Sequence, residues 1–221
     1  MKIKTQRTPN YGYLSKDNNE HSVFTMKKAE TTRLMILRKA FELIYAKGYR
    51  NTSIDEIIAT TAMTKGAFYY HFKSKDAMGL AIINEILKPT LNGSFIEPLR
   101  SGADPVHSIY GLIRYLLLED EFLQVEYGCP AANFTQEMTP WDSKFTQVLE
   151  ELADEWAKVM VAALERGQQD GLIRADVVPG QVTLFVISGY WGIRNFGKLA
   201  NSKTVYLPYL KELKNYLASL R

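Results

Sequence analysis

The sequence predicts an all-α fold of about nine helices, with a small N-terminal domain followed by a larger helical domain. Two observations support this prediction. Apolar residues recur at spacings of three and four along most of the chain, which is the period of an amphipathic helix. No stretch of useful length alternates apolar and polar residues, as a half-buried strand does. With 221 residues, 46% of them hydrophobic, the chain is long enough to bury a sizeable core.

The first 26 residues show no apolar period and are rich in Asn, Lys and Thr. We predict that they form a disordered arm, because so polar a stretch cannot bury enough apolar surface to fold. The arm lacks the apolar block of a secretory signal. Met26 opens the sequence MKKAETTRLMIL, so both Met1 and Met26 are candidate translation starts. A basic arm that contacts a polyanion is the alternative interpretation.

A first helix is predicted from Lys27, and its buried face is an apolar stripe. The members of the stripe recur at spacings of three and four, and they are Ile36, Leu37, Ala40, Phe41 and Ile44. Gly48 is expected to end this helix, because glycine accepts the left-handed conformation that follows many helices. Tyr49 is then expected to fold back onto the stripe.

Two further helix starts follow closely. Ser53 is predicted to cap a second helix, with Glu56 three residues later completing a capping box. Thr64 is predicted to cap a third helix after a very short turn. Phe68 and Phe72 are four residues apart, so both point to one side of the third helix. They are expected to pack on Ile54 and Ile57 of the second helix and on the first helix, which leaves Tyr69, Tyr70 and His71 on other faces.

A fourth helix is predicted from Ser74 to about Leu87, where Pro89 ends or kinks it. Asp104 is expected to cap the next helix, with Pro105 in its first turn. The remaining helices are predicted at about 131–138, 142–169, 179–198 and 207–220. The predicted organisation is therefore an arm at 1–26, a three-helix domain at 27–76 and a second domain at 77–221.

Three short helices with a tight turn before the third are typical of a helix-turn-helix domain. In that arrangement the third helix projects into a DNA major groove about 12 Å wide, and the first two support it. Thr64-Lys65-Gly66-Ala67, called the tip below, would then be exposed. The tip offers backbone N–H groups, a hydroxyl and an ammonium, and its small residues let the backbone approach the bases closely.

The distribution of charge favours the same partner. Residues 1–75 hold 14 Lys and Arg against 6 Asp and Glu, a net charge of +8, whereas the rest of the chain carries −5. A basic N-terminal third indicates a polyanion partner for that third. Chance asymmetry on a soluble surface is the alternative.

The stretch RLMILRKAFELIYAKGYRNTSIDEIIATTAMTKGAFYYHFKSKDAM resembles the DNA-binding domain of the tetracycline-repressor (TetR) family of bacterial regulators. The likeness runs without a gap through KGY, TS, TKGAFYYHF and SKDAM. It implies an all-helical homodimer whose N-terminal domain binds a double-stranded DNA operator. The second domain would bind a small-molecule effector and dimerise. Ala62 departs from the glycine that the family commonly has at the turn, so a slight adjustment is expected there.

The resemblance also assigns roles to individual residues. Tyr69, His71 and Lys75 match positions that contact DNA phosphates, and Thr52 and Ser53 match a helix start that meets the DNA backbone. The tip matches the part nearest the bases, with its threonine near phosphate or base. Tyr70, the second tyrosine of FYYHF, either contacts DNA or is partly buried and supports the helix. The predicted DNA-binding residues are Thr52, Ser53, Thr64, Lys65, Gly66, Ala67, Tyr69, Tyr70, His71 and Lys75.

The last two helices suggest a dimer surface. Ser188, Gly189 and Gly192 place small residues at helical spacing beside Trp191. The final helix adds a leucine stripe, which comprises Leu207, Leu210, Leu213, Leu217 and Leu220. An intramolecular core would explain the same pattern, and the resemblance favours a four-helix interface between two copies.

An effector pocket is expected among the middle helices, with a mostly apolar lining. The ligand-binding candidates are Tyr110, Ile113, Phe134, Met138, Trp141, Trp156 and Trp191, with Phe122 and Met160 as further apolar candidates and Asn133, Gln136, His107 and Arg194 as polar handles. An aromatic or other hydrophobic molecule would suit this set. Core packing is the alternative role for most of them.

Cys129 is the only cysteine, which excludes an internal disulfide framework and a cysteine-based zinc site. It precedes Pro130 near a predicted helix start, where a thiolate is favoured. A redox or electrophile sensor is one interpretation of this residue, and an inert buried cysteine is the other.

A transcriptional regulator is favoured over two other classes. An enzyme would need a partner that orients Cys129 with His107, and phosphate-binding glycine loops and metal-ligand spacings are absent, so no catalysis, cofactor or metal is expected. A helical interaction module would leave the basic N-terminal part unexplained. The uncharged run VTLFVISGYWGI is too short to span a membrane. By family habit, we expect a cytoplasmic repressor that binds a palindromic operator as a dimer and is released by a hydrophobic or aromatic effector. An activator is the alternative.

Overall fold

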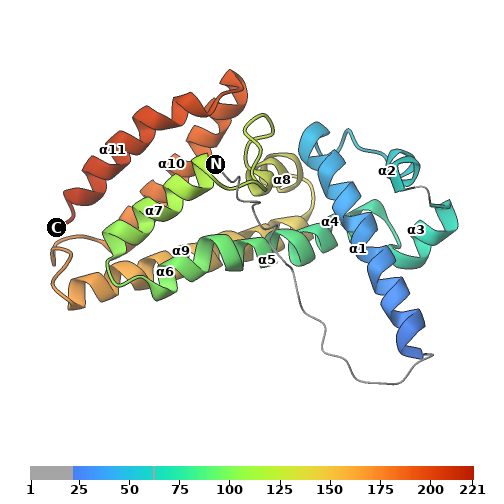
Figure 1. Ribbon diagram of the computed structural model, residues 1–221, viewed down its shortest axis with the longest axis horizontal. Helices are drawn as coiled ribbons and strands as arrows, with labels where there is room; N and C mark the ends of the chain where they lie inside the picture. The colour runs from blue at the N-terminus through green and yellow to red at the C-terminus, as the bar shows by residue number, and fades with distance from the viewer. Residues whose placement is uncertain (1–21, 62) are drawn as a thin grey trace, which may run out of the picture.

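The chain folds into helices and connecting turns, which confirms the predicted all-α class (Figure 1). The computed structural model describes residues 22–61 and 63–221, with side chains from residue 29 onward. These residues form nine helices longer than one turn and no strand, when the continuous helix from Lys75 to Ser101 is counted once. The expectations for residues 1–21 and for Ala62 lie outside the described residues.

Helix α1 spans Ser22–Lys47 and so begins before the predicted start at Lys27. The prediction of a disordered arm is therefore wrong for residues 22–26. No glycine or proline occurs between Ser22 and Lys47, so nothing local interrupts the helix. The predicted apolar stripe of α1 is buried. Gly48 follows the helix with a φ of +94°, the left-handed conformation expected of it.

Helices α2 (Ile54–Thr61) and α3 (Lys65–His71) complete a three-helix unit with α1. Phe68 and Phe72 of α3 are buried, as predicted. Ile57 of α2 is fully buried, whereas Ile54 and Ile58 pack against the core at its margin. The guanidinium of Arg33 in α1 lies 4.8 Å from the centre of the Phe72 ring. The two phenylalanines therefore anchor α3 to the other helices of the unit.

The fourth helix does not end near Leu87, so that part of the prediction is wrong. It continues to Ser101 as one linking helix, through α4 (Lys75–Ile82), a π-helical turn, α5 (Lys88–Thr90), a second π-helical turn and α6 (Glu97–Ser101). In the first π turn the N–H of Lys88 bonds to the carbonyl of Ile83, five residues back. This wider turn accommodates Pro89, which has no N–H and whose ring crowds a regular α-helix.

The larger domain is built around one long helix, α9 (Ser143–Gln169), which lies along the linking helix (Figure 1). Asp142 caps α9, and its carboxylate accepts from the N–H of Lys144 at 2.8 Å. The other helices of this domain are α7 (Pro105–Leu118), α8 (Pro130–Met138), α10 (Pro179–Ala200) and α11 (Tyr206–Ala218). Short α8 lies between the rest of this domain and the three-helix unit.

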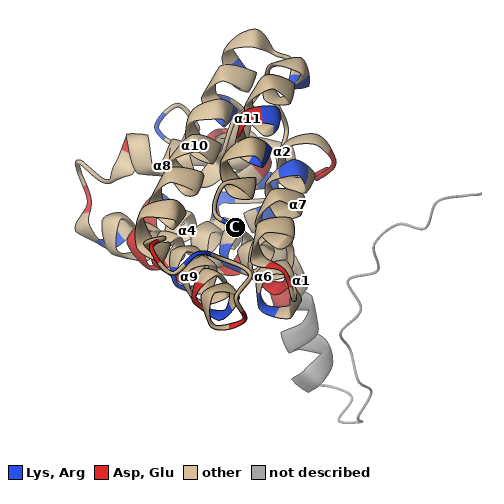
Figure 2. Ribbon diagram, turned by 90° about the vertical axis from the view of Figure 1, so that its left-hand side faces the viewer, with Lys and Arg blue, Asp and Glu red and all other residues tan. Residues whose placement is uncertain are grey.

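Basic and acidic residues are interspersed at the end of the larger domain that faces away from the three-helix unit (Figure 2). This distribution differs from the net positive charge of the N-terminal third. Among the described residues, no helix is both long and apolar enough to cross a membrane.

Candidate nucleic-acid interface and apolar cavity

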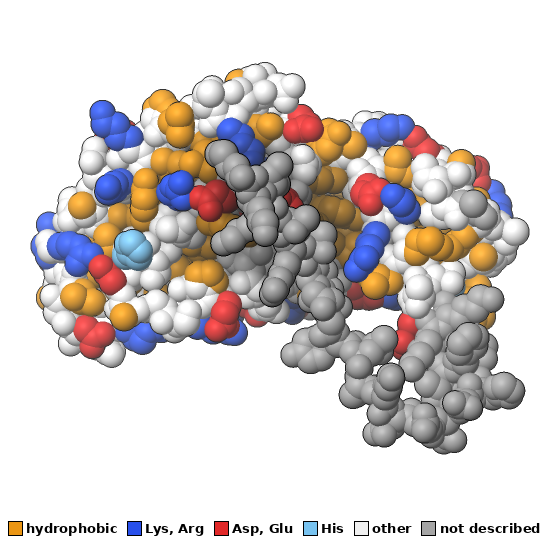
Figure 3. Space-filling view, viewed as in Figure 1, with side chains coloured by type: hydrophobic (Ala, Val, Ile, Leu, Met, Phe, Trp, Pro, Cys, Tyr) orange, Lys and Arg blue, Asp and Glu red, His pale blue; other side chains and the backbone are white. Residues whose placement is uncertain are grey.

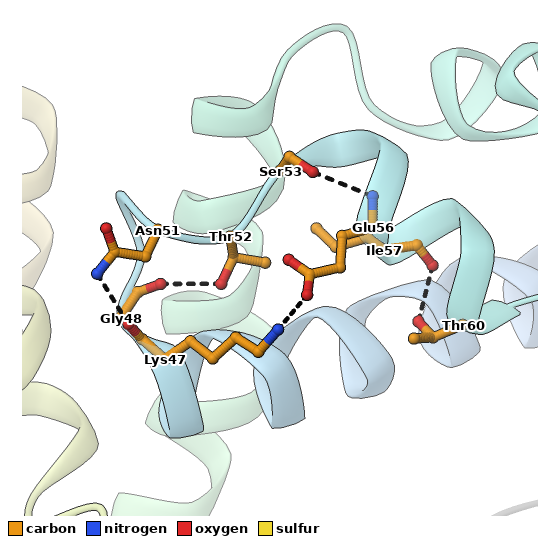
Figure 4. A network of polar contacts seen from close by, with 8 residues as sticks. All are labelled: Lys47, Gly48, Asn51, Thr52, Ser53, Glu56, Ile57 and Thr60. Atoms are coloured by element: carbon orange, nitrogen blue, oxygen red, sulfur yellow. Dashed lines mark hydrogen bonds and ion pairs between the residues drawn. The ribbon is translucent and has the colours of Figure 1, made fainter.

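Side-chain contacts fix the turn between α1 and α2 (Figure 4). The hydroxyl of Ser53 accepts from the backbone N–H of Glu56 at 3.1 Å, so Ser53 caps α2 as predicted. The carboxylate of Glu56 forms an ion pair with Lys47 at the end of α1. The hydrogen bond from Lys47 lowers the pKa of Glu56. These contacts set the orientation of α2 across α1.

Thr52 contributes to the same turn and not to the surface. Its side chain is 1% exposed, and its hydroxyl donates to the carbonyl of Gly48 at 2.9 Å (Figure 4). The side chain of Thr52 is therefore not available for the DNA contact predicted for this residue, because its hydroxyl is committed to the chain itself. Ser53 is exposed beside it.

The tip is exposed and is held in a defined conformation. The hydroxyl of Thr64 accepts from the N–H of Ala67 at 3.2 Å, which caps α3 as predicted. Thr64, Lys65 and Gly66 are exposed, and Ala67 is partly so. The Lys65 ammonium lies 3.1 Å from the carboxylate of Asp55 in α2, and this hydrogen bond raises the pKa of Lys65. Such an exposed pair is weak, so the ammonium is free to turn to another anion.

The aromatic residues that follow the tip face away from the core. Tyr69 is exposed, and Tyr70 is 79% exposed, so Tyr70 is not a buried support. His71 is partly buried. Burial lowers the pKa of His71, and the positive charge of Arg33 lowers it further. His71 is consequently neutral near pH 7 and has to gain a proton before it adds positive charge.

Lys75 lies where the linking helix begins. Its ammonium is 4.4 Å from the centre of the Tyr49 ring, a cation–π contact. The hydroxyl of Tyr49 donates to the carboxylate of Asp76 at 2.6 Å. Burial lowers the pKa of Lys75, against the opposing effect of Asp76 and Glu137. Lys75 is therefore a positioned and partly covered cation.

An apolar cavity lies in the larger domain, between the linking helix, α8, α9 and α10. The space between its lining atoms amounts to about 550 Å³ when the open solvent at its mouth is counted. The lining residues are Leu87, Thr90, Leu91, Phe95, Phe122, Leu123, Cys129, Pro130, Ala131, Thr135, Leu149, Leu152, Ala153, Trp156 and Trp191. Among these described residues none is charged. The hydroxyls of Thr90 and Thr135 donate to carbonyls within their own helices at 2.8 and 2.9 Å.

Only two of the seven predicted ligand-binding residues, Trp156 and Trp191, line this cavity. Ile113 and Met138 are core residues, and Phe134 lines a smaller gap beside Tyr45 and Tyr49. Tyr110 is partly buried, with the ammonium of Lys214 at 5.9 Å from its ring centre. Trp141 is 71% exposed and stacks with the guanidinium of Arg50 at 4.7 Å. These five residues therefore do not line the cavity, because helical spacing indicates burial but not which cavity a residue faces.

Of the further apolar candidates and the polar handles, only one lines the cavity. Phe122 lines the cavity, whereas Met160 is core. Asn133, Gln136, His107 and Arg194 are absent from the lining. Sequence reasoning missed the contributions of Leu87, Leu91 and Phe95, because the helix that carries them was predicted to end near its first member.

Cys129 borders the cavity but is only 5% exposed. Burial raises the pKa of its thiol, in opposition to hydrogen bonds from the backbone of Ala132 and Ala131. This contradicts the expectation that the helix start favours a thiolate, because desolvation outweighs the nearby N–H groups. The thiol is protonated near pH 7, which agrees with the interpretation of Cys129 as an inert buried residue.

Helix α10 exposes large apolar side chains beside its small residues. The α10 apolar face comprises Leu184, Phe185, Phe196 and Leu199, all exposed, with Ser188 and Gly192 on the same side. A Cβ at Gly192 would meet nothing within 4 Å, so the space above this glycine is open. Hydrophobic side chains also appear between charged ones on the face of the larger domain in Figure 3. Leu210, Leu213 and Leu217 of α11 are instead buried within the chain.

Comparison with known proteins identifies relatives of both parts of the chain. Residues 36–82 match the family described as bacterial regulatory proteins, tetR family. Residues 113–208 match the family described as tetracyclin repressor-like, C-terminal domain.

Individual relatives are regulators. An HTH-type transcriptional regulator of Lactococcus lactis, encoded in the lacX 3′ region and uncharacterized, is 34% identical over 127 residues, which is 58% of this chain and 65%, just under two thirds, of that one. The HTH-type transcriptional repressor DhaR of Mycobacterium sp. strain GP1 is 26% identical over 167 residues, 72% of this chain and 79% of that protein. A TetR regulator from Chloroflexus aurantiacus has the same fold, with a TM-score of 0.76, 24% identity and coverage of 88% and 96% of the two chains.

Proposed function

Because this chain belongs to the tetR family of bacterial transcriptional regulators and is a DNA-binding regulator rather than an enzyme, we propose that it is a ligand-responsive repressor. It binds a palindromic operator as a homodimer, in the cytoplasm, and an uncharged hydrophobic effector releases it. The name of one relative, the repressor DhaR, supports repression over activation.

The observation that carries the proposal is the exposed tip on a helix anchored from behind. Phe68 and Phe72 hold α3 by its buried side, which leaves Thr64, Lys65 and Gly66 exposed. Lys65 contacts bases or phosphates after it leaves Asp55. The residues that contact phosphates are Ser53, Tyr69, Tyr70, His71 and Lys75, with Gly66 and Ala67 closest to the bases. Phosphate contacts position the protein, and the few contacts with bases provide sequence preference.

The α10 apolar face supports the homodimer. Four large apolar side chains exposed on one helix are costly in water, and a second copy of the same face would cover them. Small Ser188 and Gly192 lie on that side of the helix and allow a close approach. The two copies of α3 would then meet two half-sites related by two-fold symmetry.

The apolar cavity supports an uncharged effector. No charged side chain lines it, and moving a charge from water into such a lining without a partner is costly. Trp156, Trp191 and Phe95 offer flat apolar surfaces that suit an aromatic or alicyclic molecule. Leu87, Thr90 and Leu91 of the linking helix also line the cavity, and that helix begins at Lys75 beside the three-helix unit. An effector that moves this helix would change the separation of the two tips.

Selection of DNA from a random library by the purified protein tests the proposal. We expect enrichment of a palindrome, and an affinity for it that falls steeply with salt as phosphate contacts release counterions. Effector binding and operator binding must then oppose each other by the same factor. No enriched site, or an affinity insensitive to salt, would contradict a DNA-binding repressor. An enriched site whose affinity no hydrophobic compound changes would contradict only the effector.

A further inference from the structure

The segment from Phe122 to Met138, called the cavity segment below, faces the cavity on one side and the three-helix unit on the other. Phe122, Cys129 and Thr135 line the cavity. Glu137 and the carbonyl of Gly128, in the same segment, hydrogen-bond to the end of α1 and the turn that follows it. One short stretch therefore contacts both of the places that an effector signal must connect.

The first connection is made by Glu137. Its carboxylate accepts from the backbone N–H of Tyr49 at 3.0 Å and from that of Arg50 at 2.9 Å, one oxygen for each amide. These amides directly follow Gly48, and a Cβ at that glycine would lie 2.9 Å from a Glu137 carboxylate oxygen. Trp141 adds its stacking contact with Arg50. The end of α8 and the residues after it thus hold the turn that leads into α2 by hydrogen bonds and a stacking contact.

The second connection is a buried node around Arg194 of α10. Its guanidinium donates to the carbonyl of Gln124 at 2.9 Å, to that of Gly128, and to the hydroxyl of Tyr45 at 3.3 Å. Tyr45 belongs to α1 and itself donates to the carbonyl of Gly128 at 2.6 Å. Arg194 is fully buried, and its Nε and Nη1 have no hydrogen-bond partner. The node therefore joins α1, the cavity segment and the helix that carries the α10 apolar face.

Burial of a charge without a carboxylate partner is costly, so this node is a poor device for stability alone. It does connect α1 of the three-helix unit with α10, which carries the proposed dimer face. We propose that the cavity segment is a second route, beside the linking helix, from the cavity to the tips. Glu137 and Arg194 are its positioning residues. This inference rests on the proposed dimeric repressor.

The test measures tip separation without any effector. Ala59 is exposed on α2 and outside the proposed interface, so Ala59→Cys provides one spin label in each copy. The natural Cys129 is buried, and mass spectrometry checks that it stays unlabelled. Pulsed electron–electron distance measurements then report the separation between the two labels in the dimer. Affinity is measured on the duplex that the wild-type protein selects.

We expect Glu137→Ala to broaden the label-to-label distance distribution and to weaken DNA binding roughly two- to thirtyfold, the range typical of coupling residues. Arg194→Met, which keeps the volume and removes the charge, should act in the same direction. Glu126→Ala is the control, because Glu126 is exposed in the same segment and its loss changes the net charge equally. The control should match the parent in both measurements.

The possible results distinguish a failure of this inference from a failure of the proposed dimer. If Glu137→Ala does not fold, the same two measurements are made on Glu137→Gln, which keeps the side-chain volume but offers one acceptor oxygen in place of two. A dimeric parent whose Glu137 and Arg194 variants keep its distance distribution and affinity would overturn this inference alone. A monomeric parent in light scattering would overturn the proposed dimer and this inference with it.

Discussion

Phe68 and Tyr70 are two residues apart on α3, yet the first is buried and the second is almost fully exposed. The difference follows from helical geometry, which turns residues two apart to opposite sides. The buried side anchors the helix, and the other side is left for a partner. On a helix of seven residues, each side chain therefore has one of two functions: support or contact.

Tyr69→Phe and Lys75→Ala test the phosphate contacts. Each change should weaken binding by about 1.5–3 kcal/mol, as the loss of a hydrogen bond to a charged group does. The loss should be equal for all DNA sequences, because phosphates carry no sequence information. Gel-shift titrations on the selected site and on scrambled duplexes measure both quantities. A change in sequence preference would assign these residues to bases instead.

His71 predicts a dependence of stability on pH. Burial and Arg33 lower its pKa in the folded chain, so the unfolded chain binds more protons near and below the ordinary value of about 6.5. This contribution to stability is present above about pH 6.5 and is lost as the pH falls. Urea titrations at pH 7.5 and 5.5 should show a smaller loss for His71→Asn than for the wild-type chain. An equal loss would mean that folding leaves the proton affinity of His71 unchanged.

At the scale of elements, local signals predicted most helices well. Ser53, Thr64 and Asp104 all act as the predicted caps, because a cap depends on a few adjacent residues. The predicted end of the linking helix near Leu87 was wrong. Pro89 normally stops a helix, and the π turn that accommodates this proline depends on packing. Most of the cavity lining was unpredictable for the same reason. It requires knowing which helices face one another.

Gly197 and Gly111 form a matched pair for the packing of helices. A Cβ at Gly197 in α10 would lie 2.1 Å from the hydroxyl oxygen of Tyr206 and 2.5 Å from its ring, whereas one at Gly111 in α7 would meet nothing within 4 Å. Gly197→Ala should therefore cost about 1–3 kcal/mol through overpacking. Gly111→Ala should add about 0.5–1 kcal/mol, since alanine favours a helix over glycine. Denaturant titrations measure both, and equal effects would refute the close approach of α10 and α11.

At the scale of the whole molecule, recognition of one DNA site requires two copies of the chain. A single α3 offers too few contacts with bases to select one site, and a symmetric pair doubles them. The sequence predicted a dimer face through Ser188, Gly189 and Gly192, but Gly189 packs against Tyr209 of α11, so only the other two lie on the proposed face. The sequence did not show that large apolar residues of α10 are exposed while the leucines of α11 are mostly buried. The same periodic pattern of apolar residues is expected for an exposed interface and for a buried core.

Gly192→Arg should separate the two copies without unfolding either. The space above Gly192 is open within one chain, so the long side chain meets only a partner. We expect a folded monomer in light scattering, with operator affinity reduced at least tenfold, because each half-site is then bound alone. A Gly192→Arg protein that is still dimeric would place the dimer interface elsewhere.

The most direct test of the central claim is dimethyl sulfate footprinting on the selected duplex, because this reagent methylates guanine N7 in the major groove. If the exposed ends of two α3 helices dock there, two clusters of protected guanines should appear, centred about 34–36 Å apart or otherwise related by two-fold symmetry. Replacing Lys65 and Gly66 together should remove both clusters. Guanines that stay fully reactive under saturating protein would show that these helices do not enter the major groove.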